Sequence, residues 1–332
     1  MKIFITGIAG FLGSHIAESM IKHGHEVHGI DNLIGGYSDN VPEGAIWSAM
    51  DCSYLESMTK KLIGMDVVVH TACTAYEGLS VFSPHFVTQN TSQISATVFT
   101  AAVRNGVRRI VNCSSMSRYG GNPVPFTEDQ RPNPEDPYAI AKVAGESLLW
   151  NMAETHGFEA VNLVPHNIVG PRQKYDDPYR NVVSIMANRM LQGKGAIIYG
   201  DGEQTRCFSD IRDVLRCFEQ AILTDVAVGK TINVGPDEEP CTINKVASIV
   251  RRLCDFNGEF IYYPDRPREV KHAHCSADLA REVFGYETGF TLWETCESIV
   301  NYIKTRGPKP FQYHLPVEIE KGAPRTWVDR LI

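Results

Sequence analysis

The sequence has no apolar run close to the roughly 20 residues that a membrane-spanning helix needs, which argues against an integral membrane protein. It begins MKIFITG, a strand pattern from residue 2 that leaves no room for a signal peptide. It also lacks a basic excess, because 32 Lys and Arg face 39 Asp and Glu for a net charge of −7. This balance argues against a nucleic-acid scaffold and against a polybasic membrane-surface protein.

Cysteine motifs are absent as well. The nine cysteines are scattered, none forms a CxxC, and no His/Cys cluster has the spacing of a zinc site. We therefore expect free thiols in a reducing compartment, the cytoplasm, and no metal. Internal repeats and low-complexity stretches are lacking too, which leaves an ordinary globular chain with one large or two smaller domains.

What the sequence does contain is a regular alternation of short apolar strands and helical periodicity. Strands are expected at Lys2–Thr6, Glu26–Asp31, Met65–Thr71, Arg109–Cys113, Ala160–Val164 and Thr231–Val234. Helices are expected at Phe11–His23, Gln93–Asn105, Tyr138–His156 and Val214–Leu223. The alternation predicts βαβ units, and hence an α/β fold with a Rossmann-type doubly wound parallel sheet.

The regular alternation ends after about residue 170, where Pro, Gly, Tyr and charged residues become frequent. We expect a Rossmann domain from residues 1–168 plus about 208–235. A smaller, interleaved α/β substrate-binding domain is expected from about 169–207 plus 236–310. The C-terminal tail, 311–332, has no role that the sequence reveals.

A glycine-rich loop, Gly7-Ile8-Ala9-Gly10-Phe11-Leu12-Gly13, joins the first strand to the first helix. Glycines there allow a tight turn, close approach of a pyrophosphate and close helix–strand packing, and the helix N-terminus offers free N–H groups. Asp31 ends the second strand, where a carboxylate accepts hydrogen bonds from a ribose 2′-hydroxyl and repels a 2′-phosphate. This context predicts NAD rather than NADP, against the alternatives of a plain turn and an ordinary surface aspartate.

Tyr138 and Lys142 form a YxxxK pattern and lie one turn apart on a predicted helix. A tyrosine pKa near 10 is too high for a base at neutral pH, but a nearby ammonium and a positive nicotinamide ring would lower it. Ser115, at the end of a neighbouring strand, can bond the same substrate oxygen. A base, a group that tunes it and an orienting hydroxyl suit alcohol oxidation by hydride transfer; the alternative is a surface i,i+4 pair.

In order along the chain, GIAGFLGSH, VVHTAC, SSMSRYGG, EDPYAIAKVAGE, HNIVGPRQ, YGDGEQTRCFSDIRDV and DRPREV resemble the motifs of the extended short-chain dehydrogenase/reductases, which include the NAD-dependent epimerases and dehydratases of nucleotide sugars. The resemblance runs from Met1 to about Ile303 and is nearest to the UDP-glucose and UDP-N-acetylglucosamine 4-epimerases. It implies Ser115, Tyr138 and Lys142 as the catalytic residues. The implied NAD-binding residues are Gly7, Gly10, Phe11, Leu12, Gly13, Asp31, Asn32, Asp51, Cys52, Thr71, Ala72, Cys73, Asn90, Tyr138 and Lys142.

The resemblance also implies a nucleotide-sugar site, with a UDP-sugar as the expected small-molecule partner. Asn167, Arg206 and Arg266 match residues that hold the diphosphate, and arginine suits bidentate phosphate contact. Glu269 matches an acidic residue that contacts a uridine ribose. The implied substrate-binding residues are Tyr76, Ser80, Ser115, Ser117, Asn167, Arg180, Arg206, Arg266, Glu269 and Cys275.

The two residues after Ser115 bear on the reaction. The 4,6-dehydratases carry an Asp-Glu pair there and the decarboxylating members a Glu, whereas this chain has Met116-Ser117. Neither side chain can protonate a leaving hydroxyl or act as a carboxylate base, so the sequence favours 4-epimerisation through a 4-keto sugar. A dehydratase, decarboxylase or reductase of the same fold is the alternative, and a non-catalytic NAD-binding regulatory protein is the alternative of another class.

Departures from the family pattern bear on the sugar. Two extra residues lie between Glu269 and Asp278, and Cys275 falls near a gate position where a large Tyr excludes a 2-acetamido group. Cys275 would leave room for it, unless it is a buried core cysteine. Arg180 could meet the carboxylate of a uronic acid, and His166 is expected to be packed.

The resemblance further implies a homodimer with a four-helix interface. The two candidate helices in this chain are Gln93–Asn105 and Tyr138–His156. No nucleic-acid or membrane partner is expected.

Overall fold

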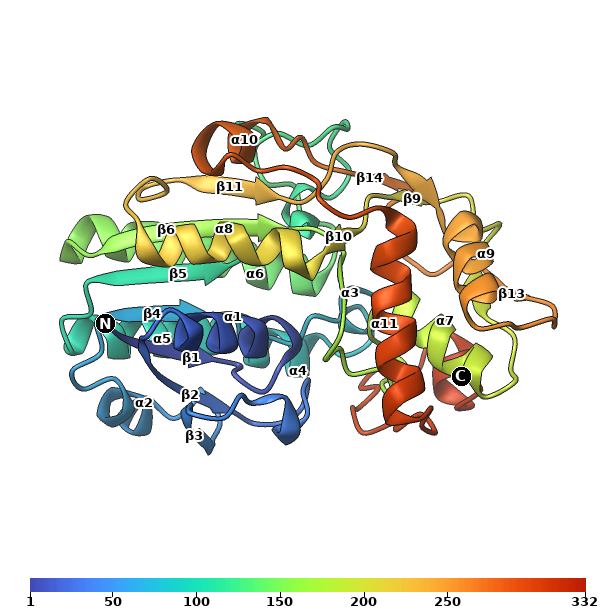
Figure 1. The fold of residues 1–332 in the computed structure, drawn as a ribbon, viewed down its shortest axis with the longest axis horizontal. Coiled ribbons are helices and arrows are strands. Elements are labelled where there is room, and N and C mark those ends of the chain that lie inside the picture. The colour runs from blue at the N-terminus through green and yellow to red at the C-terminus, as the bar shows by residue number, and fades with distance from the viewer.

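The computed structural model describes all 332 residues. Its centre is a sheet of seven parallel strands in the order β11-β6-β5-β4-β1-β2-β3 (Figure 1). Their bounds are β1 Lys2–Thr6, β2 Glu26–Asp31, β3 Ile46–Ala49, β4 Val67–His70, β5 Arg109–Cys113, β6 Glu159–Pro165 and β11 Thr231–Val234. The chain winds outward from β1 to β2 and β3, then crosses back to β4. The order therefore reverses between β1 and β4, which is where α/β sheets bind their ligands.

Helices cover both faces of this sheet (Figure 1). On one face, α1 (Phe11–Lys22) and α8 (Ile211–Leu223) bury their apolar sides against strand residues in a core of 27 residues. On the other face, α2 (Leu55–Lys61), α5 (Ile94–Arg104) and α6 (Pro137–His156) supply a second core of 16 residues. Strands buried on both faces explain the nearly continuous apolar runs of the sequence.

A smaller lobe lies beyond the carboxyl ends of the strands (Figure 1). Its core packs α7 (Val182–Leu191), α9 (Ile243–Leu253) and α11 (Leu292–Arg306) together. Short strand pairs surround it, namely β7 (Ile168–Val169) with β10 (Ser209–Asp210), β8 (Ile197–Tyr199) with β13 (Ile261–Tyr263), and β9 (Thr205–Arg206) between β12 (Cys241–Thr242) and β14 (His272–Ala273). Within the stretch expected to form the smaller domain, α10 (Asp278–Phe284) instead packs on the core of the large sheet.

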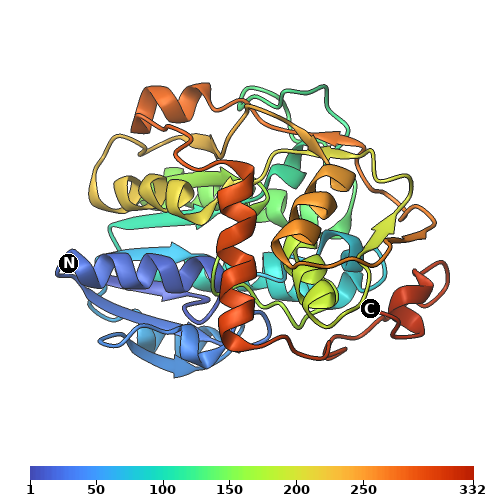
Figure 2. The same cartoon turned by 45° about the vertical axis from the view of Figure 1, so that its right-hand side comes forward.

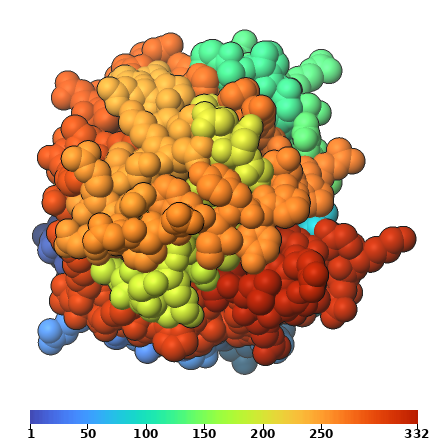
Figure 3. Space-filling model, turned by 90° about the vertical axis from the view of Figure 1, so that its right-hand side faces the viewer, coloured from blue at the N-terminus to red at the C-terminus, as the bar shows by residue number.

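The C-terminal tail folds back over the smaller lobe (Figures 2 and 3). After α11 it runs past α3 (Glu77–Ser80) and α4 (Pro84–Thr88) and ends in α12 (Arg325–Val328). Ser83 Oγ donates a hydrogen bond to Pro316 O at 2.5 Å, and Arg189 Nη1 donates one to Leu331 O at 3.2 Å. The segment without a readable role in the sequence is therefore an ordered part of this lobe.

The expected elements of the large sheet are confirmed, most of them to within two residues. The structure adds β3, the short strands of the smaller lobe and several one-turn helices, none of which has enough periodic residues to be recognised in the sequence. None of the helices is both long and apolar enough to span a membrane.

Candidate active site

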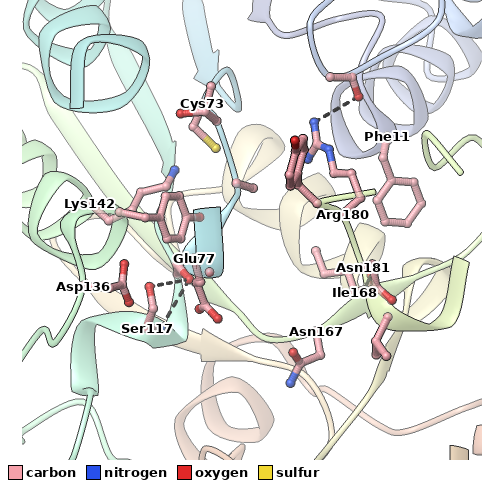
Figure 4. A pocket seen from close by; sticks show the side chains of 18 of the residues that line it. Phe11, Cys73, Glu77, Ser117, Asp136, Lys142, Asn167, Ile168, Arg180 and Asn181 are labelled. Atoms are coloured by element: carbon pink, nitrogen blue, oxygen red, sulfur yellow. Dashed lines mark hydrogen bonds between the residues drawn. The ribbon is translucent and has the colours of Figure 1, made fainter. Parts of the chain in front are cut away.

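A cavity of about 470 Å³ lies where the carboxyl ends of the strands meet the smaller lobe. Residues of both lobes line it, from the glycine-rich loop at one end to β8, β14 and the tail at the other. Figure 4 shows Lys142, Asp136, Ser117 and Glu77 gathered on one side of this space, with Phe11 and Arg180 on the other. The topology thus brings the sequence-predicted cofactor and substrate residues to one place.

The glycine-rich loop is a tight cradle. Gly7 has a φ of 77°, which favours glycine, and a Cβ on Gly13 would lie 2.1 Å from Gly7 O. Gly10 caps α1 without any side-chain hydrogen bond to the helix. The first N–H groups of α1 are thus available to an anion at the cavity, and the loop fits a pyrophosphate.

Two carboxylates mark the ribose end of the cradle. Asp31 accepts hydrogen bonds from the N–H groups of Ala9 (2.9 Å) and Leu33 (2.7 Å). Burial raises the pKa of Asp31, although both N–H groups oppose the shift. Each oxygen keeps a lone pair for a ribose hydroxyl. Asp51 accepts a hydrogen bond from Asn32 at 2.9 Å, and both Asn32 and Asp51 line the cavity as predicted.

The residues that the sequence predicts to be catalytic meet at the opposite wall. Ser115 caps a short 3₁₀ helix, and Ser117 Oγ donates a hydrogen bond to Ser115 Oγ at 2.9 Å. Tyr138 and Lys142 lie in the first turns of α6, with Lys142 Nζ 5.8 Å from the centre of the Tyr138 ring. Lys142 Nζ donates to Cys113 O at 2.8 Å, which ties α6 to the end of β5.

In the protein alone, the pKa of Tyr138 is raised well above its usual value. Burial is the main cause, negative charge from Cys73 and Glu77 adds to it, and a hydrogen bond with Ser115 opposes it. We predicted that Lys142 and a bound nicotinamide ring together lower the pKa of Tyr138. The protein groups alone do not lower it. The positive ring of bound NAD would favour the phenolate of Tyr138.

Two arginines face the cavity from the smaller lobe. Arg206 donates to the carbonyls of Val270 (2.7 Å) and Lys271 (3.2 Å), and burial lowers its pKa. Arg266 makes a two-pronged ion pair with Glu269 at 2.8 and 3.0 Å. These backbone and carboxylate contacts hold both guanidinium groups in place, an arrangement that suits a diphosphate.

Asn167 and Arg180 occupy different ends of the cavity. Asn167 Nδ2 donates to Cys207 O at 2.9 Å, next to β9, which carries Arg206. Arg180 Nη2 instead donates to Gly35 O at 3.1 Å and stacks over the Tyr76 ring at 4.6 Å. Arg180 thus lies by the loop that follows Asp31, away from Arg206 and Arg266.

Most of the predicted site residues line the cavity, but Tyr76, Ser80 and Cys275 do not. The Tyr76 hydroxyl donates to Asp177 at 2.6 Å and its ring is buried. Ser80 donates to the Glu77 carbonyl at 2.6 Å and to Asp136 at 3.1 Å. These two predicted substrate residues support the wall from behind.

The predicted gate needs a correction as well. Cys275 is fully buried in a core cluster with Phe126 and Val164, so its alternative reading as a core cysteine is the one observed. Ala273, two residues earlier on β14, lines the cavity instead. Ala273 belongs to the same core cluster as Cys275 and reaches the cavity from its edge. His166 is packed as expected, with Nε2 2.8 Å from Pro236 O.

Sequence reasoning missed three contributors to the wall. Asp136 caps α6 through the N–H of Ala139 at 2.9 Å, and an Asp before Pro137 is a recognisable cap signal. Glu77 lies between Tyr76 and Ser80, two residues that were expected to bind the substrate. Trp327, from the tail, had no sequence signal at all.

Comparisons with known proteins agree on the family. The pattern described as the NAD dependent epimerase/dehydratase family matches residues 3–235. The chain is 29% identical over 318 residues to a UDP-glucose 4-epimerase of Mycolicibacterium smegmatis, covering 92% of this chain and 99% of that protein. It is also 29% identical over 276 residues to a UDP-N-acetyl-alpha-D-glucosaminuronate decarboxylase of Bacillus cytotoxicus, covering 79% of this chain and 83% of that protein.

A solved relative has the same architecture. The structure of UDP-glucuronic acid 4-epimerase from Bacillus cereus, in complex with UDP-glucuronic acid and NAD, is 26% identical with a TM-score of 0.86 over 92% of this chain and 100% of that one. The glycine cradle and Asp31 fit the same cofactor, NAD. The chain therefore belongs to the NAD-dependent epimerase/dehydratase family.

Proposed function

We propose that this protein interconverts a UDP-sugar and its 4-epimer through a transient 4-keto sugar. The observation that carries the proposal is the placement of Ser115, Tyr138 and Lys142 on one wall of a cavity whose other end is a glycine cradle. The residues beside Ser115 are Met116 and Ser117, which offer no acid for a leaving group. One base is enough for 4-epimerisation.

The chain's own residues would handle the 4-hydroxyl proton. Tyr138 takes it as a phenolate and later returns it, while Ser115 orients the same oxygen and Lys142 favours the phenolate by its charge. Bound NAD supplies a reversible hydride acceptor at C4. Between the two hydride transfers the 4-keto sugar has to rotate in the site, so that the hydride returns to the opposite face of C4.

Arg206 and Arg266 would hold the diphosphate during that turn. A firm grip there leaves the sugar ring free to rotate about its bonds to the phosphate. The small Ala273 side chain at the wall supports acceptance of a 2-acetamido group, which keeps N-acetylhexosamines among the candidate substrates. Arg180 contacts Gly35 O, the Tyr76 ring and Asp177, and these contacts give no specific support for a uronic acid.

The decarboxylase relative makes decarboxylation the second candidate. It would need a carboxylate base beside Ser115, where this chain has Met116 and Ser117. The non-catalytic regulator stays a third possibility, which an activity measurement decides.

Purified protein incubated separately with UDP-glucose, UDP-N-acetylglucosamine and UDP-glucuronate, without added reductant, tests the proposal. Proton NMR should show the 4-epimer of at least one sugar. Tyr138→Phe should slow this reaction by about 100-fold or more, the usual scale for losing a general base, with the same bound NAD. A dehydrated or decarboxylated product would contradict 4-epimerisation, and equal turnover by Tyr138→Phe would contradict the assigned base.

A further inference from the structure

The carboxyl group of Glu77 lines the cavity and makes no hydrogen bond or ion pair within the protein. Glu77 begins α3, and its side chain is enclosed by the surrounding walls of the cavity. Asp31, Asp136 and Glu269 are engaged, because the first two accept backbone N–H groups and Glu269 pairs with Arg266, whereas Glu135, like Glu77, has no such partner. Glu77 is thus free to meet a ligand.

Glu77 lies between Tyr138 at one end of the expected substrate site and Arg206 and Arg266 at the other. Its charge acts on Tyr138, and the charges of Arg206 and Arg266 act on it in turn. A Cβ on the next residue, Gly78, would lie 3.4 Å from Arg266 Nη1. In the proposed function the sugar spans the interval from Tyr138 at C4 to the diphosphate at the arginines. Glu77 therefore faces the sugar ring.

The surroundings suit proton transfer near neutral pH. Burial, followed by the nearby Asp136, raises the pKa of Glu77 to about 7, and Glu269 adds to the effect while Arg206 and Arg266 oppose it. Both protonation states are then populated, as a group that takes and returns a proton requires.

We propose that Glu77 is a second proton-transferring residue, which removes and returns a hydrogen on a ring carbon next to C4 while C4 is a ketone. The inference rests on the proposed function, since the keto group is what acidifies that hydrogen. The C–H bond breaks, its electron pair enters the enolate that extends to the 4-keto oxygen, and an O–H bond forms on Glu77. Reversal restores the C–H bond, so no further oxidant or reductant is needed.

Turnover in D₂O tests this directly. Plain 4-epimerisation leaves every carbon-bound hydrogen in the sugar, whereas the proposed step brings solvent deuterium to C3 or C5. With UDP-glucose, UDP-N-acetylglucosamine and UDP-glucuronate as probes, NMR of the recovered sugars should show deuterium at one of these carbons. Glu77→Gln should reduce the rate of incorporation by about 100-fold or more. Glu135→Gln, which removes another exposed cavity carboxyl, should leave incorporation unchanged.

Three outcomes would overturn the inference, and they are distinguishable. A 4-epimer without deuterium refutes the step at Glu77 and leaves the proposed function intact. Deuterium that persists in Glu77→Gln assigns the exchange to another group. Neither epimer nor deuterium with any of the three sugars refutes the proposed function together with the inference. Bound NAD measured in each variant shows that the fold is retained.

Discussion

At the scale of single residues, the catalytic wall combines groups that are locked in place with one that is not. Lys142 is fixed by its 2.8 Å hydrogen bond to Cys113 O, and Ser115 by Ser117. Glu77 has no such partner. A site that must handle more than one proton benefits from this difference, because the fixed groups define where the sugar oxygen lies and the free carboxyl can follow the ring.

Glu77 should also make stability depend on pH. Its pKa of about 7 in the folded state lies above the ordinary 4.5, so the folded protein binds this proton more tightly and loses stability as pH rises between those values. Glu77→Gln removes that loss. Melting temperatures should therefore favour the variant over wild type more at about pH 8 than at about pH 5. An equal difference at both pH values would contradict the raised pKa.

The residues predicted from the sequence are those whose roles depend on local order. Gly7, Gly13 and Asp31 sit in one strand–loop–helix unit, so their geometry follows from their spacing. Ala273 and Glu77 could not be assigned in this way. The place of Ala273 at the cavity wall depends on the course of β14. The place of Glu77 depends on how α3 packs against a cavity that is built by segments far apart in the sequence.

At the scale of elements, α6 presents an apolar residue to solvent. Tyr138 and Lys142 point into the cavity, whereas Ile140 on the outer side is 55% exposed. In the predicted homodimer, α6 and α5 of two copies cover this side. An interface with another copy would explain why an apolar side chain, Ile140, stands on the outward side of α6, where Ser147, Asn151 and Glu154 are also exposed.

Ile140→Asp should therefore convert the dimer to a monomer, because it places a charge in the centre of the predicted interface. Sedimentation at micromolar concentration measures the outcome. Ile261→Asp is the matched control, since Ile261 is 41% exposed and belongs to β13 of the smaller lobe. A monomeric wild type, or an Ile140→Asp variant that still dimerises, would contradict the predicted interface.

Helices and strands were predicted correctly where burial gives the sequence a regular pattern of apolar residues. The central strands carry mostly apolar residues on both sides because helices cover both faces. The two- and three-residue strands of the smaller lobe, such as β9 and β14, are defined only by their partners in space. No sequence pattern that short can specify such a partner.

At the scale of the whole molecule, the tail completes the cavity. Alignments that cover 99% of the mycobacterial relative leave 8% of this chain outside, about the length of the segment after α11. Trp327 and Ile332 from this segment line the cavity, and the Trp327 ring packs edge-on against Phe82 and Tyr179. Only the folded chain reveals this, because the contacts that hold Trp327 at the cavity, with Phe82 and Tyr179, join residues far apart in sequence.

Trp327→Ala should weaken binding of UDP by about tenfold or more, equivalent to about 1.4 kcal/mol, and leave NAD binding unchanged. The reason is that Trp327 lies against Gly78, beside Arg266 and far from the glycine cradle. Calorimetric titration with each ligand measures both affinities. Trp293→Ala, at an exposed tryptophan of α11, serves as the control. Equal loss of UDP and NAD binding would indicate that the variant unfolds, and would contradict a local role of Trp327 at the UDP end of the cavity.

The central claim is that C4 gives up a hydride and receives the same one back on its other face. The most direct test uses the UDP-sugar that the protein turns over, prepared with deuterium at C4. The account predicts a 4-epimer that keeps its deuterium at C4, even in ordinary water and in the presence of excess unlabelled cofactor. Loss of that deuterium to solvent, or a product with an unchanged C4, would contradict it.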